Sequence, residues 1–140
     1  MKFKTELDSI KFFCNQLEYS GFTGVQATQY VDQYSYYDIQ AKWGKKKVRF
    51  ELKRRDLESD TYNDSVIEYF KYQEFVKDIT NGQIDKGYVV SFFNDVYTID
   101  DICGEHTLSI KQAAKTTEFD QNYKINKTFV HYKQQKKFQY

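Results

Sequence analysis

The chain has 140 residues, of which 40 % are hydrophobic and 19 % are aromatic, and its formal net charge is only +1. This length suits a single domain spanning residues 1–140 that can bury roughly two thirds of its unfolded surface, and the composition argues against disorder along the whole chain. The N-terminal segment has charges every few residues and no apolar run of signal or membrane length. We therefore expect an intracellular protein without a membrane partner.

The cysteine and histidine content excludes several common kinds of site. Cys14 and Cys103 lie far apart in the chain without a CxxC pair, which predicts free thiols. Only His106 and His131 are present, so the CGEH segment at 103–106 is a poor zinc candidate, because a closed tetrahedral site needs four ligands. Ser-His-Asp chemistry is set aside as well, because any hydroxyl can be paired with a histidine on paper.

The predicted elements alternate between helices and strands. Apolar residues recur at helical spacing in 6–22, where Gly21 fits a C-terminal stop. Strand-forming residues dominate 28–43 and 47–53, and helical spacing returns in 59–82, which opens with cap-forming residues and closes with Asn-Gly. Later strands are predicted at 87–93 and 127–132. This order predicts an α/β protein with a mixed β-sheet and helices packed against it.

The segment YYDIQAKWGKKKVRFELKRR, residues 36–55, holds most of the information about function. If Gly44-Lys45 forms the two-residue loop of a hairpin, with Gly first as a type II′ turn prefers, Trp43 pairs with Lys46. Counting outward from that pair places Asp38 opposite Glu51. Directly opposed residues have Cβ atoms about 4.5 to 5.5 Å apart, so the two carboxylates are expected to lie close enough to share one cation.

The paired acids predict a metal site. Two unneutralised carboxylates at that distance are unfavourable, and a divalent cation removes the conflict. Mg²⁺ (or Mn²⁺) prefers oxygen ligands and keeps several waters, so Asp38 and Glu51 together with solvent and a phosphate oxygen make an adequate site. Lys53 lies one strand step beyond Glu51 on the same face, where it is expected to orient a water and neutralise developing charge. The alternative is a charged surface hairpin with a cross-strand ion pair.

Asp38, with twelve residues between it and Glu51-Leu52-Lys53, resembles the motif of the PD-(D/E)xK, or restriction-endonuclease-like, nuclease superfamily. The resemblance covers residues 6 to 80 and implies a restriction-endonuclease-like mixed sheet flanked by helices. In that superfamily the Asp and Glu bind Mg²⁺ and the Lys assists catalysis. Tyr37 stands where the family name has Pro. The resemblance also suggests a resolvase-like member from a phage or mobile element, with a homodimer as one expected assembly.

Two residues on the predicted helices are added to the candidate site. Glu6 falls between Phe13 and Leu17 on an apolar helix face, where an unpaired carboxylate is costly. Resolvase-like members carry an acid on this helix that reaches the metal, so Glu6 resembles a third ligand; fraying near the N-terminus is the alternative. Gln73 interrupts an apolar stripe of the second helix, with Lys77 one turn later, which suggests a polar cleft. The alternative has Gln73 bonded to backbone and Lys77 lying along an apolar edge.

Basic residues cluster in the same segment, which holds eight of them against two acids between residues 38 and 55. Phosphate contacts from such a patch give sequence-independent DNA affinity that weakens with salt. The expected DNA-binding residues are Lys42, Lys45, Lys46, Lys47, Arg49, Arg54 and Arg55. The prediction is therefore a Mg²⁺-dependent nuclease that hydrolyses phosphodiester bonds in DNA. The alternatives are a non-catalytic nucleic-acid-binding or assembly module that keeps the nuclease fold, and an interaction protein that uses its aromatic surface.

Overall fold

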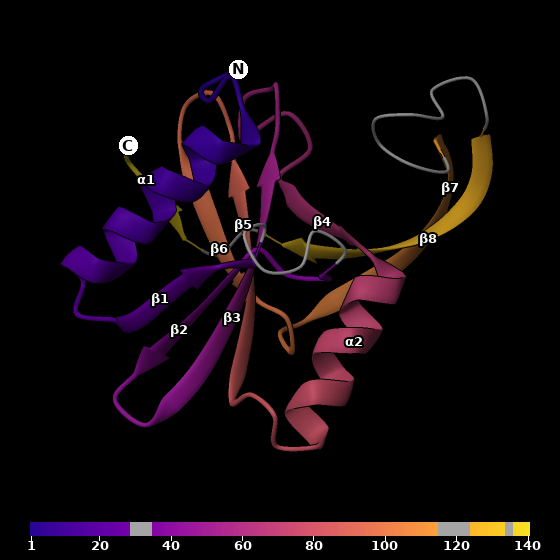
Figure 1. Cartoon of the computed structure of the whole chain (residues 1–140). Helices are drawn as coiled ribbons and strands as arrows, with labels where there is room; N and C mark the ends of the chain where they lie inside the picture. The colour runs from indigo at the N-terminus through magenta and orange to yellow at the C-terminus, as the bar shows by residue number, and fades with distance from the viewer. Residues whose placement is uncertain (29–34, 115–123, 134–135) are drawn as a thin grey trace.

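A computed structural model describes residues 1–28, 35–114, 124–133 and 136–140. Figure 1 shows the arrangement of the elements in this part of the chain. Neither helix in it is long and apolar enough to cross a membrane. The elements are α1 (Glu6–Tyr19), β1 (Thr23–Ala27), β2 (Ile39–Trp43), β3 (Lys46–Arg54), β4 (Asp64–Glu68), α2 (Tyr69–Thr80), β5 (Lys86–Phe92), β6 (Tyr97–Asp101), β7 (His106–Ala114), β8 (Lys124–Lys133) and β9 (Lys137–Phe138).

The strands form two sheets. The larger sheet has six strands in the order β1-β2-β3-β5-β6-β9, and the smaller has three in the order β4-β8-β7. β3 and β5 pair in parallel, while their neighbours in the large sheet pair antiparallel, so this sheet is mixed. The helices lie on opposite faces of the large sheet, with α2 beside the small sheet (Figure 1). The predicted α/β class, a mixed sheet flanked by helices, is confirmed.

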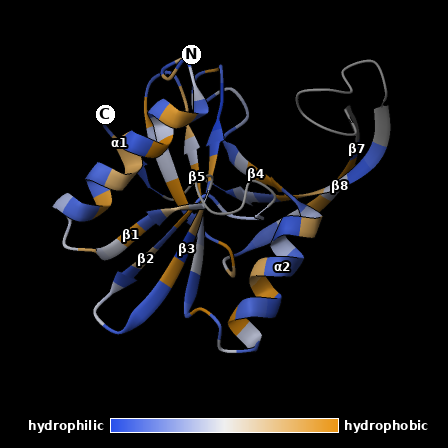
Figure 2. Cartoon of the chain, viewed as in Figure 1, coloured by the Kyte–Doolittle hydropathy of each residue, from blue (hydrophilic) through white to orange (hydrophobic). Residues whose placement is uncertain are grey.

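One hydrophobic cluster lies on each face of the large sheet. The first packs α1, through Ile10, Phe13 and Leu17, against buried residues of β2, β3 and β5. The second packs Phe75 of α2 against β5 and the small sheet on the other face. Gly87 allows this close approach of α2, because a Cβ there would collide with the Phe75 ring. Figure 2 shows the apolar residues as orange segments on both helices and on the central strands.

The first helix forms as predicted. The side chain of Thr5 accepts a hydrogen bond from the backbone N–H of Asp8 at 3.1 Å and so caps the N-terminus. The helix ends at Tyr19, and Gly21 adopts a φ of 104°, a left-handed conformation that glycine reaches without a Cβ clash.

The hairpin register is also confirmed. Trp43 pairs with Lys46 and Ile39 with Phe50, as counting outward from Gly44-Lys45 predicts. Gly44 has a φ of 62°, and Lys45 is not among the residues with positive φ, which fits the predicted type II′ turn. β2 begins only at Ile39, however, so the predicted alternation does not extend back to Tyr37, which packs against the second cluster, on the α2 face.

The second predicted helix is only half right. Its first part is the strand β4, which pairs antiparallel with β8, and the helix α2 begins at Tyr69. Residues 64–68 alternate in burial, with Ser65 and Ile67 buried, and this period of two marks a strand. The predicted strand at 28–43 is shorter, since β2 begins at residue 39, and residues 29–34 lie outside the described part. The strands at 87–93 and 127–132 are found as β5 and β8, whereas β1, β6, β7 and β9 were not predicted.

Candidate active site

Charged side chains gather on the α2 face of the large sheet, opposite α1. On β3, Phe50 and Leu52 turn into the cluster beneath α1, so the residues that alternate with them turn the other way. Glu51 and Lys53 thus share the face that looks toward α2 and the end of β4. The polar cluster consists of Asp38, Glu51, Lys53, Glu68 and Lys71, which interact through hydrogen bonds, ion pairs or electrostatic coupling.

Glu51 is the most buried member, with a relative exposure of 4 %. Its Oε1 accepts a hydrogen bond from Nζ of Lys71 on α2 at 3.0 Å. Burial and the negative charge of Asp38 nevertheless raise the pKa of Glu51 to about 8. Removing water from a carboxylate disfavours its charged form, and the ammonium groups of Lys71 and Lys53 do not offset that cost here. The protein therefore holds this carboxylate in a setting that favours additional positive charge.

Asp38 lies directly before β2 and is fixed to β3 by its backbone and its side chain. Its N–H donates to the carbonyl of Phe50 at 2.9 Å, and its Oδ2 accepts from the N–H of Leu52 at 2.7 Å. Burial raises the pKa of Asp38, the Leu52 hydrogen bond opposes this, and the charge of Glu6 adds to the rise. Asp38 and Glu51 thus form a coupled pair of acids that each resist ionisation.

Lys53 is held by Glu68, which ends β4 and precedes α2. Lys53 Nζ lies 2.6 and 2.7 Å from the two carboxylate oxygens of Glu68. Burial lowers the pKa of Lys53, whereas the charges of Lys53 and Lys71 lower that of Glu68 to about 2 against the opposing effect of its burial. Lys71 also lies 3.6 Å from Glu68 and bridges it to Glu51, and these two carboxylates raise the pKa of Lys71 against its desolvation.

The two helical candidates occupy different surroundings. Glu6, the first residue of α1, is exposed rather than enclosed in the apolar stripe, yet it acts electrostatically on Asp38. Gln73 and Lys77 are both exposed on α2, so the expected polar pair inside an apolar stripe is wrong. The residue of α2 that enters the polar cluster is Lys71. The catalytic role of Gln73 stays a prediction without a contact among the described residues of the cluster.

The seven expected DNA-binding residues divide into two groups. Lys42, Lys45, Lys46 and Lys47 are exposed near the hairpin turn. Arg49 is bound internally: it donates to Asp78 and to the Tyr36 hydroxyl at 2.7 Å and lies over the Tyr37 ring at 4.3 Å.

Arg54 and Arg55 also bond within the protein. Arg54 donates to the carbonyl of Lys4 at 3.0 Å, and Arg55 donates to the carbonyl of Val66 at 2.8 Å. The exposed part of the predicted basic patch is therefore the lysine group near the turn.

Glu68 and Lys71 are the members of the cluster that sequence analysis missed. Both lie inside the segment that was predicted as one long helix, and that prediction hid the end of a strand. Once β4 is recognised, Glu68 falls on the strand position that precedes the helix and Lys71 lies three residues later. The alternation in 64–68 appears in the burial of the side chains and not in the residue types, because Val66 and Ile67 are adjacent, so the sequence offered no clear signal for this strand.

The acidic side chains of the site can be compared with the ligands that the predicted Mg²⁺ ion would take. Among the described residues, no group of three or more Asp, Glu, His or Cys side chains lies close enough to hold a metal. The buried pair of Asp38 and Glu51 still offers oxygen donors with excess negative charge. A two-carboxylate site fits Mg²⁺, because this ion usually keeps several waters and takes one or two carboxylates together with substrate phosphate.

Comparisons with known proteins support the fold. No protein-family model and no curated protein sequence matches the chain. Among solved structures, the chain is similar to Hjc, a Holliday junction resolvase from the archaeal hyperthermophile Archaeoglobus fulgidus. The sequence identity is 15 % and the TM-score 0.51, and the match covers 68 % of this chain and 74 % of the resolvase chain. The likeness shows a nuclease-like fold of the restriction-endonuclease-like type, as the sequence predicted.

The raised pKa of Glu51 predicts a pH-dependent effect of Glu51→Gln on stability in EDTA. The folded protein keeps a proton on Glu51 up to about pH 8, whereas the unfolded chain releases it near 4.5. The stabilising contribution is therefore complete below pH 4.5 and is lost as pH rises toward 8. Glu51→Gln removes this loss, so its free energy of unfolding relative to wild type should rise by at least about 1 kcal/mol between pH 5 and 8.

Denaturant titrations at a series of pH values measure this difference. Glu74→Gln, at an exposed position of the same helix that carries Lys71, is the matched control and should follow the wild-type pH profile. Parallel profiles for wild type and Glu51→Gln from pH 5 to 8.5 would contradict the assignment.

Proposed function

We propose that this protein is a Mg²⁺-dependent nuclease that hydrolyses phosphodiester bonds in DNA. The observation that carries the proposal is the acid pair of partly buried Asp38 and buried Glu51, on the same face of the sheet as Lys53. The similarity to a Holliday junction resolvase supports DNA, and branched DNA in particular, as the substrate class. A homodimer and a phage or mobile-element origin stay predictions.

Asp38 and Glu51 are the residues that would hold Mg²⁺, with Glu6 as a nearby third acid. When bound, the ion would activate a water molecule and stabilise negative charge on the scissile phosphate. The backbone N–H of Leu52 fixes one oxygen of Asp38, so this ligand is oriented before any ion arrives. An oriented ligand keeps the reorganisation needed on binding small.

Lys53 supplies the positive charge next to the acid pair. Glu68 holds its ammonium by two short contacts, which limits its rotamers and directs it toward the cluster. A preorganised ammonium stabilises charge that develops on a phosphate oxygen in the transition state. Lys71 donates a hydrogen bond to Glu51 at 3.0 Å, and its positive charge partly opposes the rise in the pKa of this carboxyl group. We therefore assign Lys53 to catalysis and Lys71 to maintenance of the site.

The second candidate is a non-catalytic DNA-binding module that keeps the nuclease fold. The contact between Lys71 and Glu51 favours the non-catalytic module. The ammonium group lies 3.0 Å from a carboxylate oxygen that a nuclease would need as a metal ligand. Both candidates predict DNA binding, and only the nuclease predicts divalent-metal binding and cleavage.

Cleavage assays with Mg²⁺ or Mn²⁺ on linear, single-stranded and branched DNA separate the candidates. Lys53→Ala should slow cleavage by about 10²-fold or more, the scale of losing one preorganised electrostatic contact, while metal binding is retained. Asp38→Asn should abolish metal-dependent cleavage and preserve or tighten DNA binding, because a negative charge near the phosphates is removed. Lys77→Ala, on the exposed side of α2, is the control and should cut like wild type.

Two results would reject the nuclease. One is wild-type protein that binds these substrates but cuts none of them above the EDTA background. The other is calorimetry that detects no Mg²⁺ or Mn²⁺ binding that depends on Asp38 and Glu51. Together these results would leave the non-catalytic module as the better account.

We expect the exposed lysines to contribute to DNA binding and Arg49 to contribute to the stability of the fold. Replacing Lys45, Lys46 and Lys47 together by Gln should weaken DNA binding and reduce the log-log salt slope by about one unit per lost phosphate contact. Arg49→Gln should instead lower the free energy of unfolding, because it leaves the half-buried Asp78 carboxylate without its ion pair. Binding titrations at several salt concentrations and denaturant unfolding measure the two effects. This assignment of roles is wrong if Arg49→Gln reduces the salt dependence of DNA binding as much as the lysine variant does.

A further inference from the structure

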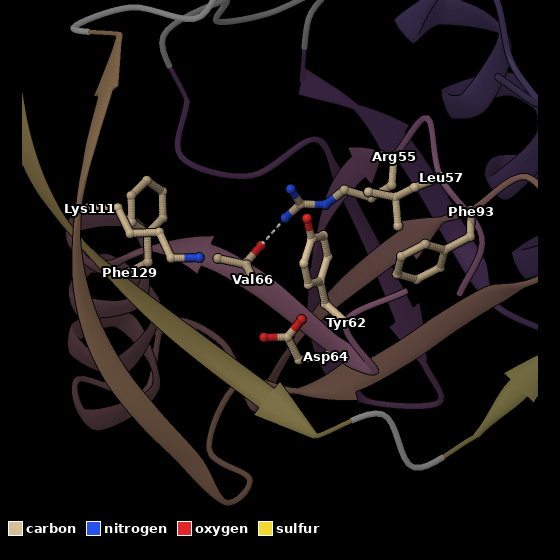
Figure 3. A pocket seen from close by; sticks show the side chains of 8 residues that line it. All are labelled: Arg55, Leu57, Tyr62, Asp64, Val66, Phe93, Lys111 and Phe129. Atoms are coloured by element: carbon tan, nitrogen blue, oxygen red, sulfur yellow. Dashed lines mark hydrogen bonds between the residues drawn. The ribbon is translucent and has the colours of Figure 1, made fainter. Parts of the chain in front are cut away.

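A pocket of about 280 Å³ lies where the end of β3 meets the open face of the small sheet (Figure 3). Its walls combine cations with aromatic and aliphatic side chains. Arg55 and Lys111 point toward each other across Val66, and the ring of Tyr62 stands between Arg55 and Asp64. The complete lining is Arg55, Leu57, Tyr62, Asp64, Val66, Phe93, Lys111 and Phe129.

Arg55 indicates that the pocket takes an anion. Its guanidinium is partly buried, and burial lowers its pKa against the opposing effect of the Glu68 and Asp64 charges. Among the described residues it makes no ion pair within 4.0 Å, and its one hydrogen bond in the described part goes to the Val66 carbonyl. A guanidinium has five N–H donors in a planar fork suited to phosphate, so most of its bonding capacity is open to a ligand. Lys111, exposed on β7, adds a second positive charge.

Tyr62 and Phe129 give the pocket surfaces for a flat ring. Tyr62 is 75 % exposed, so a ligand can reach its ring. Aromatic side chains that line a positively charged groove bind single-stranded nucleic acid by stacking on its bases. The volume, just under the usual range for ligand pockets, suits one base rather than a longer segment.

The position of the pocket connects it with the candidate active site. Arg55 follows Lys53 by two residues, and Val66 precedes Glu68 by two residues on β4. One such strand step is about 6.6 Å, so the pocket lies beside the Lys53–Glu68 pair. We propose that this pocket binds an unpaired nucleotide next to the scissile phosphate, with its base on Tyr62 and its phosphate between Arg55 and Lys111. This inference rests on the proposed nuclease function and names its substrate class, DNA with an unpaired nucleotide.

Binding in EDTA tests the pocket without requiring cleavage. The probe is a DNA duplex with one unpaired 2-aminopurine, compared with the same duplex fully paired. Wild type should bind the unpaired probe about tenfold more tightly, the scale of one stacked base, and should quench its fluorescence. Tyr62→Ala and Lys111→Gln should lose most of this preference, whereas Tyr62→Phe should retain it. Tyr19→Ala is the matched control, since Tyr19 is 93 % exposed on α1.

Equal affinity for the two duplexes, or an unchanged preference in Tyr62→Ala, would overturn the proposal that the pocket binds an unpaired nucleotide. That outcome leaves the proposed nuclease intact, because cleavage depends on Asp38, Glu51 and Lys53. If the protein prefers the unpaired probe but cuts no DNA, nucleotide binding in the pocket is supported and the proposed nuclease activity is rejected.

A second observation concerns the part of the small sheet next to this pocket, with which it shares Asp64. Asp64 of β4, His131 of β8 and Ser109 of β7 form a hydrogen-bonded row across three neighbouring strands. His131 Nδ1 lies 2.7 Å from Asp64 Oδ2, and its Nε2 lies 2.5 Å from Ser109 Oγ. An ionised Asp64 only accepts, so Nδ1 carries the proton and Nε2 of the neutral ring accepts the Ser109 proton.

This row has the relations expected of a nucleophile, its base and the group that orients the base. It borders a cavity of about 520 Å³ that is also lined by Asn63 and Lys133, two hydrogen-bond donors. We propose that Ser109 is a base-activated nucleophile for carboxylic esters. Its Oγ would bond to the ester carbon as its proton moves to His131 Nε2. The C–O bond to the leaving group then breaks, the leaving group takes that proton, and water hydrolyses the acyl-Ser109 ester.

A fluorophosphonate probe with peptide mass spectrometry tests Ser109. The Oγ–P bond forms as fluoride leaves, and we expect labelling of Ser109 at least tenfold above that of Ser20, an exposed serine in the same chain. His131→Asn and Asp64→Asn should each reduce the labelling to the Ser20 level, and a p-nitrophenyl acetate assay should follow the same order. Labelling of Ser109 that does not exceed Ser20, or that persists in His131→Asn, would overturn the proposal.

Discussion

The two-residue turn at Gly44-Lys45 is the constraint on which the candidate site depends. Gly44 takes the positive φ that the turn requires, and the turn length fixes the register of β2 against β3. Because side chains alternate between faces, a shift by one residue would move Glu51 and Lys53 into the apolar cluster beneath α1. The burial of Phe50 and Leu52 in that cluster opposes such a shift. Local turn geometry and core packing therefore specify the same polar face.

Charge balance is the second constraint on this face. Three acids, Asp38, Glu51 and Glu68, share it with two ammonium groups, those of Lys53 and Lys71. With every group ionised, this set has one negative charge in excess, in a place where water is largely removed. The protein meets the excess by favouring protonation of the Asp38–Glu51 pair, whereas Glu68 stays ionised between its two lysines. A bound cation would meet the same excess without a proton, and this connects the electrostatics to the proposed function.

The fold was predictable where local signals agreed with one another. The first helix had helical spacing and a glycine stop, and the hairpin had a turn, alternation and a defined register. β4 was missed because Tyr69 and the residues after it continue an apolar pattern that suits a helix, and only pairing with β8 selects a strand before them. Long-range pairing of this kind leaves no local mark in five residues, so of the small sheet only β8 was predicted as a strand.

The candidate site was predictable only where its residues come from one local segment. Asp38, Glu51 and Lys53 come from one hairpin, so counting along two strands was enough to bring them together. Glu68 and Lys71 come from a segment whose position depends on the small sheet, so sequence spacing could not place them. Arg49 and Gln73, whose proposed roles stay predictions, show a further limit of sequence spacing. A cation in a basic run was taken as a DNA contact, although Tyr36 and Asp78 surround it, and a helical wheel could not show that Gln73 faces solvent.

The residues proposed for DNA binding and cleavage follow one another along β3. The exposed lysines lie at its start beside the turn, the acid pair and Lys53 lie in its second half, and Arg55 follows its end at the pocket. Lys47 and Glu51 alternate to the same face of β3 and are four residues apart, or about 13 Å, which corresponds to about four base pairs of duplex. A duplex bound along the hairpin lysines would thus reach the acids near its end, where an unpaired nucleotide would meet Tyr62. This geometry favours substrates in which a duplex ends or branches over substrates that are continuous helix.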